Sequence, residues 1–367
     1  MDHPENDAQY AGLAVNKGIE QPPIVNPYLK KMRTAKRRSF TASEYVEGIV
    51  KGDTSILSQA VTLVESNRYE HQTLAQEVIE KCLPHACDSV RVGITGVPGA
   101  GKSTSIDTFG LHVLKRGGKL AVLAIDPSSE RSKGSILGDK TRMEALSREK
   151  NAFIRPSPSA GSLGGVARKT RETIVLCEAA GFDTVFVETV GVGQSETAVH
   201  SMVDFFLLIQ LAGTGDELQG IKRGIMEMAD GIIINKADGD NIDKANLAAA
   251  QFRNALHLFP PSESGWFPKV LTYSGYYNLG IKEIWDMVGE YMEFTKKNGY
   301  FDYKRNEQAK YWMYESINDT LRDKFYHNPA VEGMLEQTEK QVLNNEISSF
   351  VAAKRMIDLF LDNIATK

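Results

Sequence analysis

Residues 96–103 read Gly-Val-Pro-Gly-Ala-Gly-Lys-Ser and match the phosphate-binding pattern G-x-x-x-x-G-K-[ST]. The glycines let backbone N–H groups converge on the β- and γ-phosphates of a nucleotide, and the start of the following helix adds a partial positive charge. Lys102 supplies a point charge, and Ser103 is the expected magnesium ligand. The predicted phosphate contacts are Gly96, Val97, Pro98, Gly99, Ala100, Gly101, Lys102, Ser103 and Thr104. Taken alone, this loop indicates an NTPase or a kinase.

A second motif selects the base. Asn235-Lys236-Ala237-Asp238 has the form N-K-x-D and stands at the end of a predicted strand. The carboxylate of Asp238 can accept two hydrogen bonds from the N1–H and the exocyclic amine of guanine, and adenine lacks this donor pair. Ser274 and Gly275 follow the next predicted strand and are expected to complete the base contact. Together the two segments favour guanine.

Acidic residues stand at the ends of two predicted strands. Asp126 closes one of them and Glu188 closes another, and carboxylates at the carboxyl ends of parallel strands face the ligand crevice. Because magnesium prefers hard oxygen ligands, the predicted metal set is Ser103, Glu188 and one or both of Asp126 and Asp139. Asp139 has a second interpretation, as the cap of a helix that starts after it.

The segment after Glu188 bears on the rate of hydrolysis. Glu188-x-x-Gly191 stands where many GTPases carry D-x-x-G, which places the Gly191 N–H near the γ-phosphate. Gln194 lies six residues after Glu188 rather than four, so we do not assign it the water-orienting role that a glutamine has in small GTPases. Without that residue or an evident arginine finger, we expect intrinsic hydrolysis to be slow and to depend on a partner.

Short apolar runs separated by amphipathic helical stretches predict the elements that position these residues. This pattern is typical of an α/β fold in which helices cover both faces of a mostly parallel sheet. The predicted strands are Val90–Thr95, Leu120–Ile125, Thr184–Glu188, Phe205–Gln210, Gly231–Asn235 and Val270–Tyr273. Helices are predicted over Ser103–Leu114 and Val166–Ala180, and glycines close both of them.

Helical segments flank the predicted α/β domain. We expect a basic arm over 1–40, a helical segment over 41–88, the nucleotide-binding domain over 89–298 and a helical segment over 299–367. The arm is interpreted as a solvated leader, with docking onto an acidic partner surface as the alternative. The apolar stripes of the last segment must pack against another apolar surface. Either the chain's own α/β domain or a second copy could supply it, and we favour a homodimer.

The composition is that of an ordinary globular protein, with 367 residues of which 42% are hydrophobic and 25% are charged. The formal net charge is -4, so the overall charge does not favour binding to nucleic acid or to an anionic membrane. Three cysteines are too few for a disulfide framework, and Cys82, Cys87 and His85 lack the fourth ligand of a zinc site. Because we find no membrane-spanning stretch and no targeting signal, we expect a cytoplasmic protein.

Taken together, these segments resemble the MeaB/ArgK family of P-loop GTPases, the G-protein chaperones of adenosylcobalamin-dependent methylmalonyl-CoA mutase. The matching segments are GVPGAGKST at 96–104, DPSS followed by GSILGDKTRM at 126–143, LGGVARKTRE at 163–172, VETVGVGQSE at 187–196, AGTGDELQGIKRGIMEMAD at 212–230 and NKAD at 235–238. The resemblance implies a GTPase domain of the SIMIBI class, with an N-terminal helical extension and a C-terminal helical arm that forms a homodimer.

The resemblance also implies roles for single residues. The implied catalytic residues are Lys102, Asp126, Glu188 and Lys222, the implied magnesium residues are Ser103, Asp126, Asp139 and Glu188, and the implied guanine contacts are Asn235, Lys236, Asp238 and Ser274. It marks Leu211 to Gly224 as an additional switch, with Asp216, Gln219 and Lys222 carrying the signal. The alternative is a plain helix start with solvated charges. Two departures stand out: Ala212 occupies a position where proline is common, and Ser274-Gly275 replaces the usual Ser-Ala.

The function that the resemblance implies is a magnesium-dependent GTPase that docks on methylmalonyl-CoA mutase, gates the loading of adenosylcobalamin and helps to expel inactivated cofactor. The chain has no obvious corrinoid motif, so the cofactor should contact the mutase more than this protein. The alternatives are an ATPase or kinase serving basic amino-acid transport, and a chaperone of a related acyl-CoA mutase. A metal-insertion GTPase would need the His- or Cys-rich tract that this chain lacks, and a scaffold without turnover would not need Lys102, Ser103 and Glu188.

Overall fold

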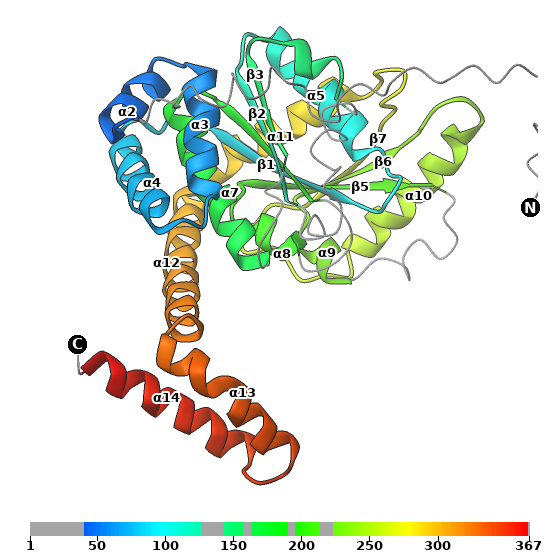
Figure 1. Ribbon diagram of the computed structural model, residues 1–367. Coiled ribbons are helices and arrows are strands. Elements are labelled where there is room, and N and C mark those ends of the chain that lie inside the picture. The colour runs from blue at the N-terminus through cyan, green and yellow to red at the C-terminus, as the bar shows by residue number, and fades with distance from the viewer. Residues whose placement is uncertain (1–39, 126–142, 157–162, 190–194, 213–222, 366–367) are drawn as a thin grey trace, which may run out of the picture. The chain divides into compact units, whose positions relative to one another are not determined.

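The structure is a computed structural model and describes residues 40–125, 143–156, 163–189, 195–212 and 223–365. Within these ranges seven strands form one sheet in the order β3-β2-β4-β1-β5-β6-β7, and every neighbouring pair is parallel (Figure 1). The strands are β1 (Val90–Gly96), β2 (Leu120–Ile125), β3 (Ala152–Arg155), β4 (Thr184–Thr189), β5 (Phe205–Leu211), β6 (Gly231–Asn235) and β7 (Lys269–Thr272). The predicted α/β class is confirmed, and β3 is the strand that the sequence analysis missed.

Strand β1 lies in the middle of this order, between β4 and β5. Because the carboxyl ends of parallel strands meet at one edge of a sheet, the ends of β1, β4 and β5 lie side by side. The phosphate loop follows β1, Glu188 lies near the end of β4, and β5 ends at Leu211. The strand order therefore brings together three segments that are distant in sequence.

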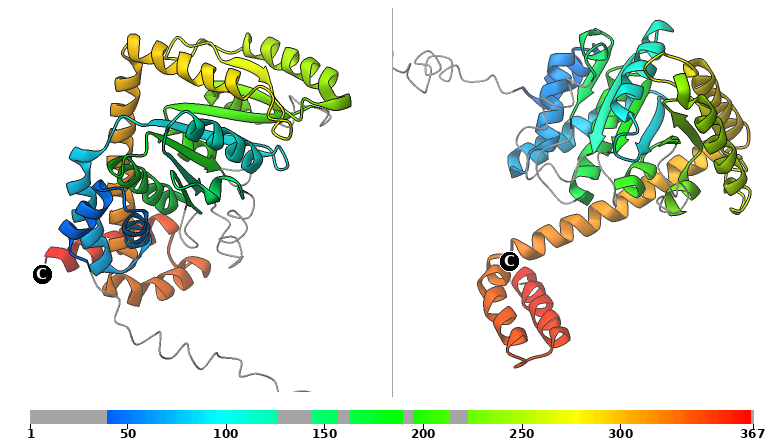
Figure 2. Two further views of the ribbon diagram at one scale, coloured as in Figure 1. Left: turned by 90° about the horizontal axis from the view of Figure 1, so that it is seen from above. Right: turned by 90° about the vertical axis from the view of Figure 1, so that its right-hand side faces the viewer.

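Helices cover both faces of the sheet (Figures 1 and 2). In chain order they are α2 (Ala42–Val50), α3 (Thr54–Glu65), α4 (Tyr69–Cys82), α5 (Lys102–Lys115), α7 (Leu163–Ala179), α8 (Ser195–His200), α9 (Arg223–Met228), α10 (Ile242–Leu256), α11 (Ile281–Lys297), α12 (Tyr300–Tyr326), α13 (Pro329–Leu343) and α14 (Ser349–Ala365). None of these described helices has both the length and the apolar character needed to cross a membrane.

Alternate residues of the central strands fill two separate hydrophobic cores. Leu207 and Ile209 of β5 belong to the core beneath α5 and α11. The residue between them, Leu208, packs on the opposite face together with Ile232 of β6 and with α10. Side chains of a strand alternate between faces, so a strand that is covered on both sides must be apolar throughout. This explains the uninterrupted apolar runs in the sequence.

The predicted N-terminal helical segment forms α2, α3 and α4, which pack against one another and against α7. Asp53 caps α3, because its carboxylate accepts hydrogen bonds from the backbone N–H groups of Ser55 at 2.8 Å and Ile56 at 3.2 Å. The predicted basic arm before residue 40 lies outside the described residues.

Helix α12 is bonded to Asp204, the residue immediately before β5. The guanidinium of Arg305 donates to both carboxylate oxygens of Asp204, at 2.9 and 2.8 Å, and Lys304 donates to the Asp204 carbonyl oxygen at 2.7 Å. The Asp204 side chain is only 2% exposed, so its charge needs a close partner. The start of α12 supplies this partner.

The same helix contacts the preceding residues of the α8–β5 connection. The side-chain amide of Gln308 donates to the carbonyl oxygen of Val203 at 2.8 Å, and the indole N–H of Trp312 donates to that of Ser201 at 3.0 Å. We call these bonds, with those of Lys304 and Arg305, the α12 clamp. The clamp connects the C-terminal helices to a segment that leads directly into β5.

Helices α13 and α14 pack against each other (Figure 2). The Thr338 hydroxyl of α13 lies 3.4 Å from the sulfur of Met356 in α14, and both residues are buried. Phe360 of α14 also meets Phe325 of α12, with 5.3 Å between the ring centroids. Helix α14 is therefore in contact with both α12 and α13.

Candidate nucleotide-binding site

The phosphate loop joins the end of β1 to the start of α5. Gly99 and Gly101 have φ values of +78° and +88°, which L side chains rarely adopt. At Gly96 the reason for glycine is space, because a Cβ there would lie 2.2 Å from the carbonyl oxygen of Ile209 in the neighbouring strand. The glycine spacing of the motif is therefore required by the backbone itself.

Lys102 and Ser103 form the first turn of α5. The ammonium group of Lys102 lies over its own loop and donates to the carbonyl oxygens of Gly96 at 2.8 Å and Val97 at 3.5 Å. The Ser103 hydroxyl donates to the carboxylate of Glu188 at 3.4 Å. A positive charge, a hydroxyl and a carboxylate thus meet at the N-terminus of a helix, where phosphate binding is favoured.

Glu188 comes from β4, whose register places it beside Ile94 of β1. Its side chain is only 4% exposed. The hydroxyl of the next residue, Thr189, donates a hydrogen bond of 2.9 Å to the hydroxyl of Thr95, and both threonines are buried. Sequence analysis missed this threonine pair, for which the only signal was the position of each residue at a strand end. The pair ties the phosphate strand to the strand that carries Glu188.

The oxygens of Ser103 and Glu188 are hard donors of the kind that magnesium prefers. Asp126 follows β2, which neighbours β4, but Asp126 and Asp139 both lie outside the described residues. Within the ranges that the structure covers, no group of three or more His, Cys, Asp or Glu side chains could hold a metal. Two of the four predicted metal residues are therefore brought together.

Asn235 at the end of β6 connects the base motif to the phosphate loop. Its side-chain amide donates to the carbonyl oxygen of Ala100 at 2.7 Å. Its amide oxygen accepts from the backbone N–H groups of Lys236 at 2.7 Å and Gly275 at 3.2 Å. A Cβ on Gly101 would lie 2.6 Å from the Asn235 side-chain nitrogen, so this contact also requires a glycine.

Asp238 and Ser274 meet although they follow different strands. The Ser274 hydroxyl donates to the Asp238 carboxylate, and Ser274 is fully buried. The Ser274 oxygen also accepts from the N–H of Tyr277 at 3.3 Å, and paired backbone bonds of 3.1 Å join Ser274 to Leu279. The structure thus brings Asn235, Lys236, Asp238, Ser274 and Gly275 together at one end of β6 and β7.

The predicted switch residues Asp216, Gln219 and Lys222 lie outside the described residues. The described chain reaches Ala212 on one side of this segment and resumes at Arg223 in α9 on the other. Strand β5, which ends at Leu211, neighbours β1, which leads into the phosphate loop.

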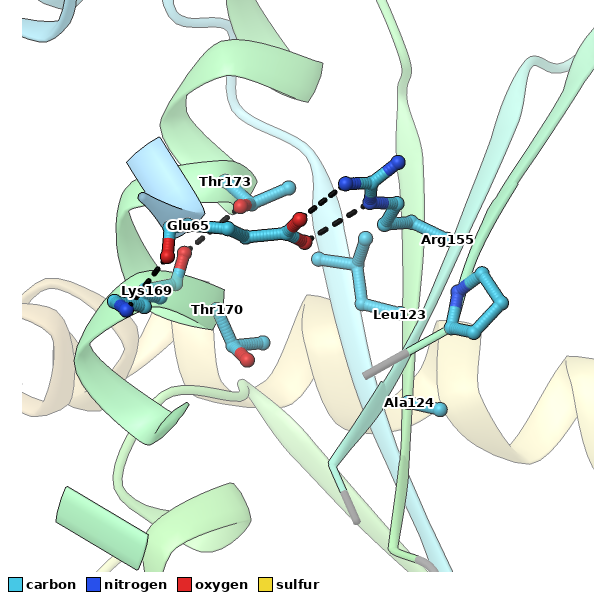
Figure 3. A pocket seen from close by; sticks show the side chains of 8 residues that line it. Glu65, Leu123, Ala124, Arg155, Lys169, Thr170 and Thr173 are labelled. Atoms are coloured by element: carbon cyan, nitrogen blue, oxygen red, sulfur yellow. Dashed lines mark hydrogen bonds and ion pairs between the residues drawn. The ribbon is translucent and has the colours of Figure 1, made fainter. Parts of the chain in front are cut away.

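A small pocket lies apart from these residues, between α3, α7 and the ends of β2 and β3 (Figure 3). The Arg155 guanidinium pairs with the Glu65 carboxylate there, donating at 2.9 Å through Nε. Lys169 donates to the Glu65 carbonyl oxygen at 2.7 Å and to the Asn67 side chain at 2.6 Å, and burial lowers the Lys169 pKa. Because these charged groups bond α3 and the residue after it to α7 and β3, the pocket is best described as the attachment of the N-terminal helices.

The family model "Methylmalonyl Co-A mutase-associated GTPase MeaB" matches residues 57–330. A putative GTPase of Caulobacter vibrioides is 50% identical over 312 residues, which cover 85% of this chain and 95% of that protein. A mitochondrial methylmalonic aciduria type A homolog of Mus musculus is 44% identical over 335 residues, covering 89% and 80%. A crystal structure described as an LAO/AO transport system kinase is 36% identical, with a TM-score of 0.69, covering 89% of this chain and 100% of that one.

Proposed function

The chain belongs to the MeaB family and is a GTPase, and we propose that its GTP cycle controls an adenosylcobalamin-dependent methylmalonyl-CoA mutase. In this proposal the protein gates the loading of adenosylcobalamin into the mutase and the release of inactivated cofactor. Binding of a guanine nucleotide is supported by the 2.7 Å hydrogen bond from Asn235 to Ala100, which joins the base motif to the phosphate loop. The proposal that the partner is a mutase is supported by the family match.

The phosphate end of the site has a lysine, a hydroxyl and a carboxylate of the kind that phosphoryl transfer uses. Catalysis of this reaction consists mostly of positioning and of stabilising the charge that spreads over the phosphate oxygens. Lys102 would turn from the carbonyl oxygens of Gly96 and Val97 to the β- and γ-phosphates, exchanging weak acceptors for charged ones. Magnesium, held by Ser103 and Glu188 with Asp126 and Asp139, would supply charge neutralisation at the phosphates.

The base end of the site suits guanine. Asp238 would accept from the guanine N1–H and exocyclic amine, and the hydroxyl of Ser274 holds its carboxylate in place. An adenine ring would leave a partly buried carboxylate without these donors, which is a strong basis for rejection. The backbone N–H groups of Lys236 and Gly275 donate to the side chain of Asn235, and these two residues would complete the base contact.

We further propose that the protein acts as a homodimer through its C-terminal helices. Large apolar side chains on α14 remain exposed, and most of them lie on one face of the helix: Phe350 at 86%, Ile357 at 50%, Leu361 at 56% and Ile364 at 54%. Tyr314, Ile317 and Leu321 form a similar exposed stripe on α12. Exposed apolar stripes of this kind suit an interaction site. Sedimentation velocity on Phe350→Glu should show a monomer if this surface forms the dimer.

A second candidate is an enzyme that serves basic amino-acid transport, which the likeness to the LAO/AO transport system kinase favours. The N-K-x-D motif argues against an ATP-dependent enzyme, because its carboxylate has no partner on adenine. Comparing the affinities for GDP and ADP separates the two: a clear preference for GDP is expected, and a preference for ADP would support the kinase.

The mutase proposal is tested by measuring GTP turnover with and without the methylmalonyl-CoA mutase of the same organism. Mutase should strongly stimulate turnover, and Lys222→Ala should lose the stimulation. Lys282→Ala is the matched control, because Lys282 is an exposed lysine on α11, paired only loosely with Asp286 at 3.6 Å. Absence of stimulation in the unaltered protein would refute this client and direct the search to a related acyl-CoA mutase.

A further inference from the structure

Tyr273 lies directly before the predicted guanine residues and is anchored on three sides. Its hydroxyl is 2.5 Å from the hydroxyl of Thr108 in α5, and its ring centroid is 5.1 Å from that of Phe109. Its backbone N–H donates to the carbonyl oxygen of Ile234, and its own carbonyl accepts from the N–H of Ala237, both at 2.9 Å. Tyr273 is also buried, with 1% exposure.

Gly275 sits against this fixed side chain. A Cβ on Gly275 would lie 3.0 Å from the Tyr273 hydroxyl and 3.4 Å from the two nearest ring carbons. Gly275 is not among the glycines with a positive φ, so its φ does not itself require a glycine. The obstacle to a side chain at this position is therefore the Tyr273 hydroxyl.

Gly275 also takes part in the base site through its N–H, which donates to the Asn235 side chain at 3.2 Å. Asn235 in turn donates to Ala100 of the phosphate loop. Any displacement of Gly275 by a clash with Tyr273 would therefore reach Asn235 and the phosphate loop. The Tyr273 hydroxyl lies between Gly275 of the base loop and Thr108 of α5, the helix that follows the phosphate loop. It therefore limits how closely the base loop can approach this helix.

We propose that Tyr273 is a positioning residue for guanine-nucleotide binding, which acts by holding Gly275 and the base loop against the phosphate-loop helix. The inference rests on the proposed guanine contacts of Asp238, Ser274 and Gly275. It makes a specific claim about a pair: the residue at 275 must be glycine when the residue at 273 carries the hydroxyl. Removing the hydroxyl should make alanine acceptable at position 275.

The test is a double-mutant cycle with Gly275→Ala, Tyr273→Phe and the combined variant, read out as the Kd for fluorescent GDP and ADP analogues. Gly275→Ala should weaken GDP binding by about tenfold, the usual size of an overpacking effect. The combined variant should bind GDP within about threefold of Tyr273→Phe alone. Gly289→Ala is the matched control, since a Cβ on this α11 glycine meets nothing within 4 Å and should leave binding unchanged. Circular dichroism verifies the fold of each variant.

Two outcomes would overturn the inference while leaving guanine recognition intact. One is a Gly275→Ala variant that binds GDP as the unaltered protein does. The other is a combined variant that binds as weakly as Gly275→Ala, because the hydroxyl would then not be the obstacle. Equal affinity of the unaltered protein for GDP and ADP is a different result: it would overturn the proposed guanine recognition itself, and the inference with it.

Discussion

The side-chain amide of Asn235 donates a hydrogen bond of 2.7 Å to the carbonyl oxygen of Ala100, although the two residues are 135 positions apart in the chain. One belongs to the strand end that carries the base motif and the other to the phosphate loop. A nucleotide that spans the site would therefore contact two segments whose relative position is already fixed. Such pre-organisation reduces the cost of ordering the site on binding.

Replacing Asn235 with alanine should weaken nucleotide binding. The change leaves the Ala100 carbonyl and the Gly275 N–H without their partner in a buried setting, a penalty of about 2 kcal/mol or roughly thirtyfold in Kd. Fluorescent GDP titration measures it. Gln251→Ala, an exposed substitution on α10, is the control and should bind normally. Normal GDP affinity in Asn235→Ala would show that the loop is positioned without this bond.

Glu188→Gln should raise the magnesium concentration that gives half-maximal GTP hydrolysis, by about tenfold. The substitution keeps the shape of a side chain that lies 3.4 Å from Ser103 and removes the negative charge that a divalent cation needs. Removing magnesium with EDTA should abolish hydrolysis in both proteins. Glu283→Gln, which changes an exposed glutamate on α11, is the control and should keep the normal magnesium requirement. An unchanged magnesium requirement would remove Glu188 from the metal set.

Arg305→Ala should destabilise the protein by about 3 kcal/mol, because it leaves the carboxylate of Asp204 buried without its charged partner. Urea unfolding gives the free energy of unfolding of each variant. Arg322→Ala changes an exposed arginine on the same helix and should stay within about 0.5 kcal/mol of the unaltered protein. If both variants unfold at the same urea concentration, the bonds of Arg305 to Asp204 contribute nothing to stability.

Acid should destabilise the fold through His200. Burial, helped by the charge of Lys304, lowers the His200 pKa to about 4, against 6.5 for an ordinary histidine. Between these values the unfolded chain binds a proton that the folded protein does not, so stability falls as the pH drops from about 6.5 toward 4. From pH 7 to pH 5 the unaltered protein should lose about 2 kcal/mol more than His200→Gln. Urea unfolding at both pH values measures this difference, and equal losses would contradict it.

The local motifs were predictable because their meaning is contained in a few adjacent residues. The phosphate loop requires glycines where the backbone turns left-handed and where Ile209 approaches, and the spacing of Gly96, Gly99 and Gly101 records these needs. The central strands were equally clear, since burial on both faces makes them apolar throughout. Strand β3 was missed because it has four residues at the sheet edge and only Phe153 among them is buried.

The contacts between distant segments could not be predicted in the same way. The bonds of Asn235 to Ala100, Tyr273 to Thr108 and Arg305 to Asp204 join residues that are about a hundred or more positions apart. Each residue alone has an ordinary local interpretation, as part of a motif, a strand end or a solvated helix. Only the strand order and the helix packing reveal the pairs.

The α12 clamp also has a consequence for the order of events during synthesis. Arg305 is made 101 residues after Asp204, and on a ribosome that adds about 5 to 20 residues per second this interval lasts about 5 to 20 seconds. During that time β1 to β6 can assemble while Asp204 still lacks its cation. We therefore expect the nascent domain to be less stable than the finished protein until α12 emerges. A chain cut before residue 304 would remain in that state and should be degraded or aggregate sooner than the full-length protein.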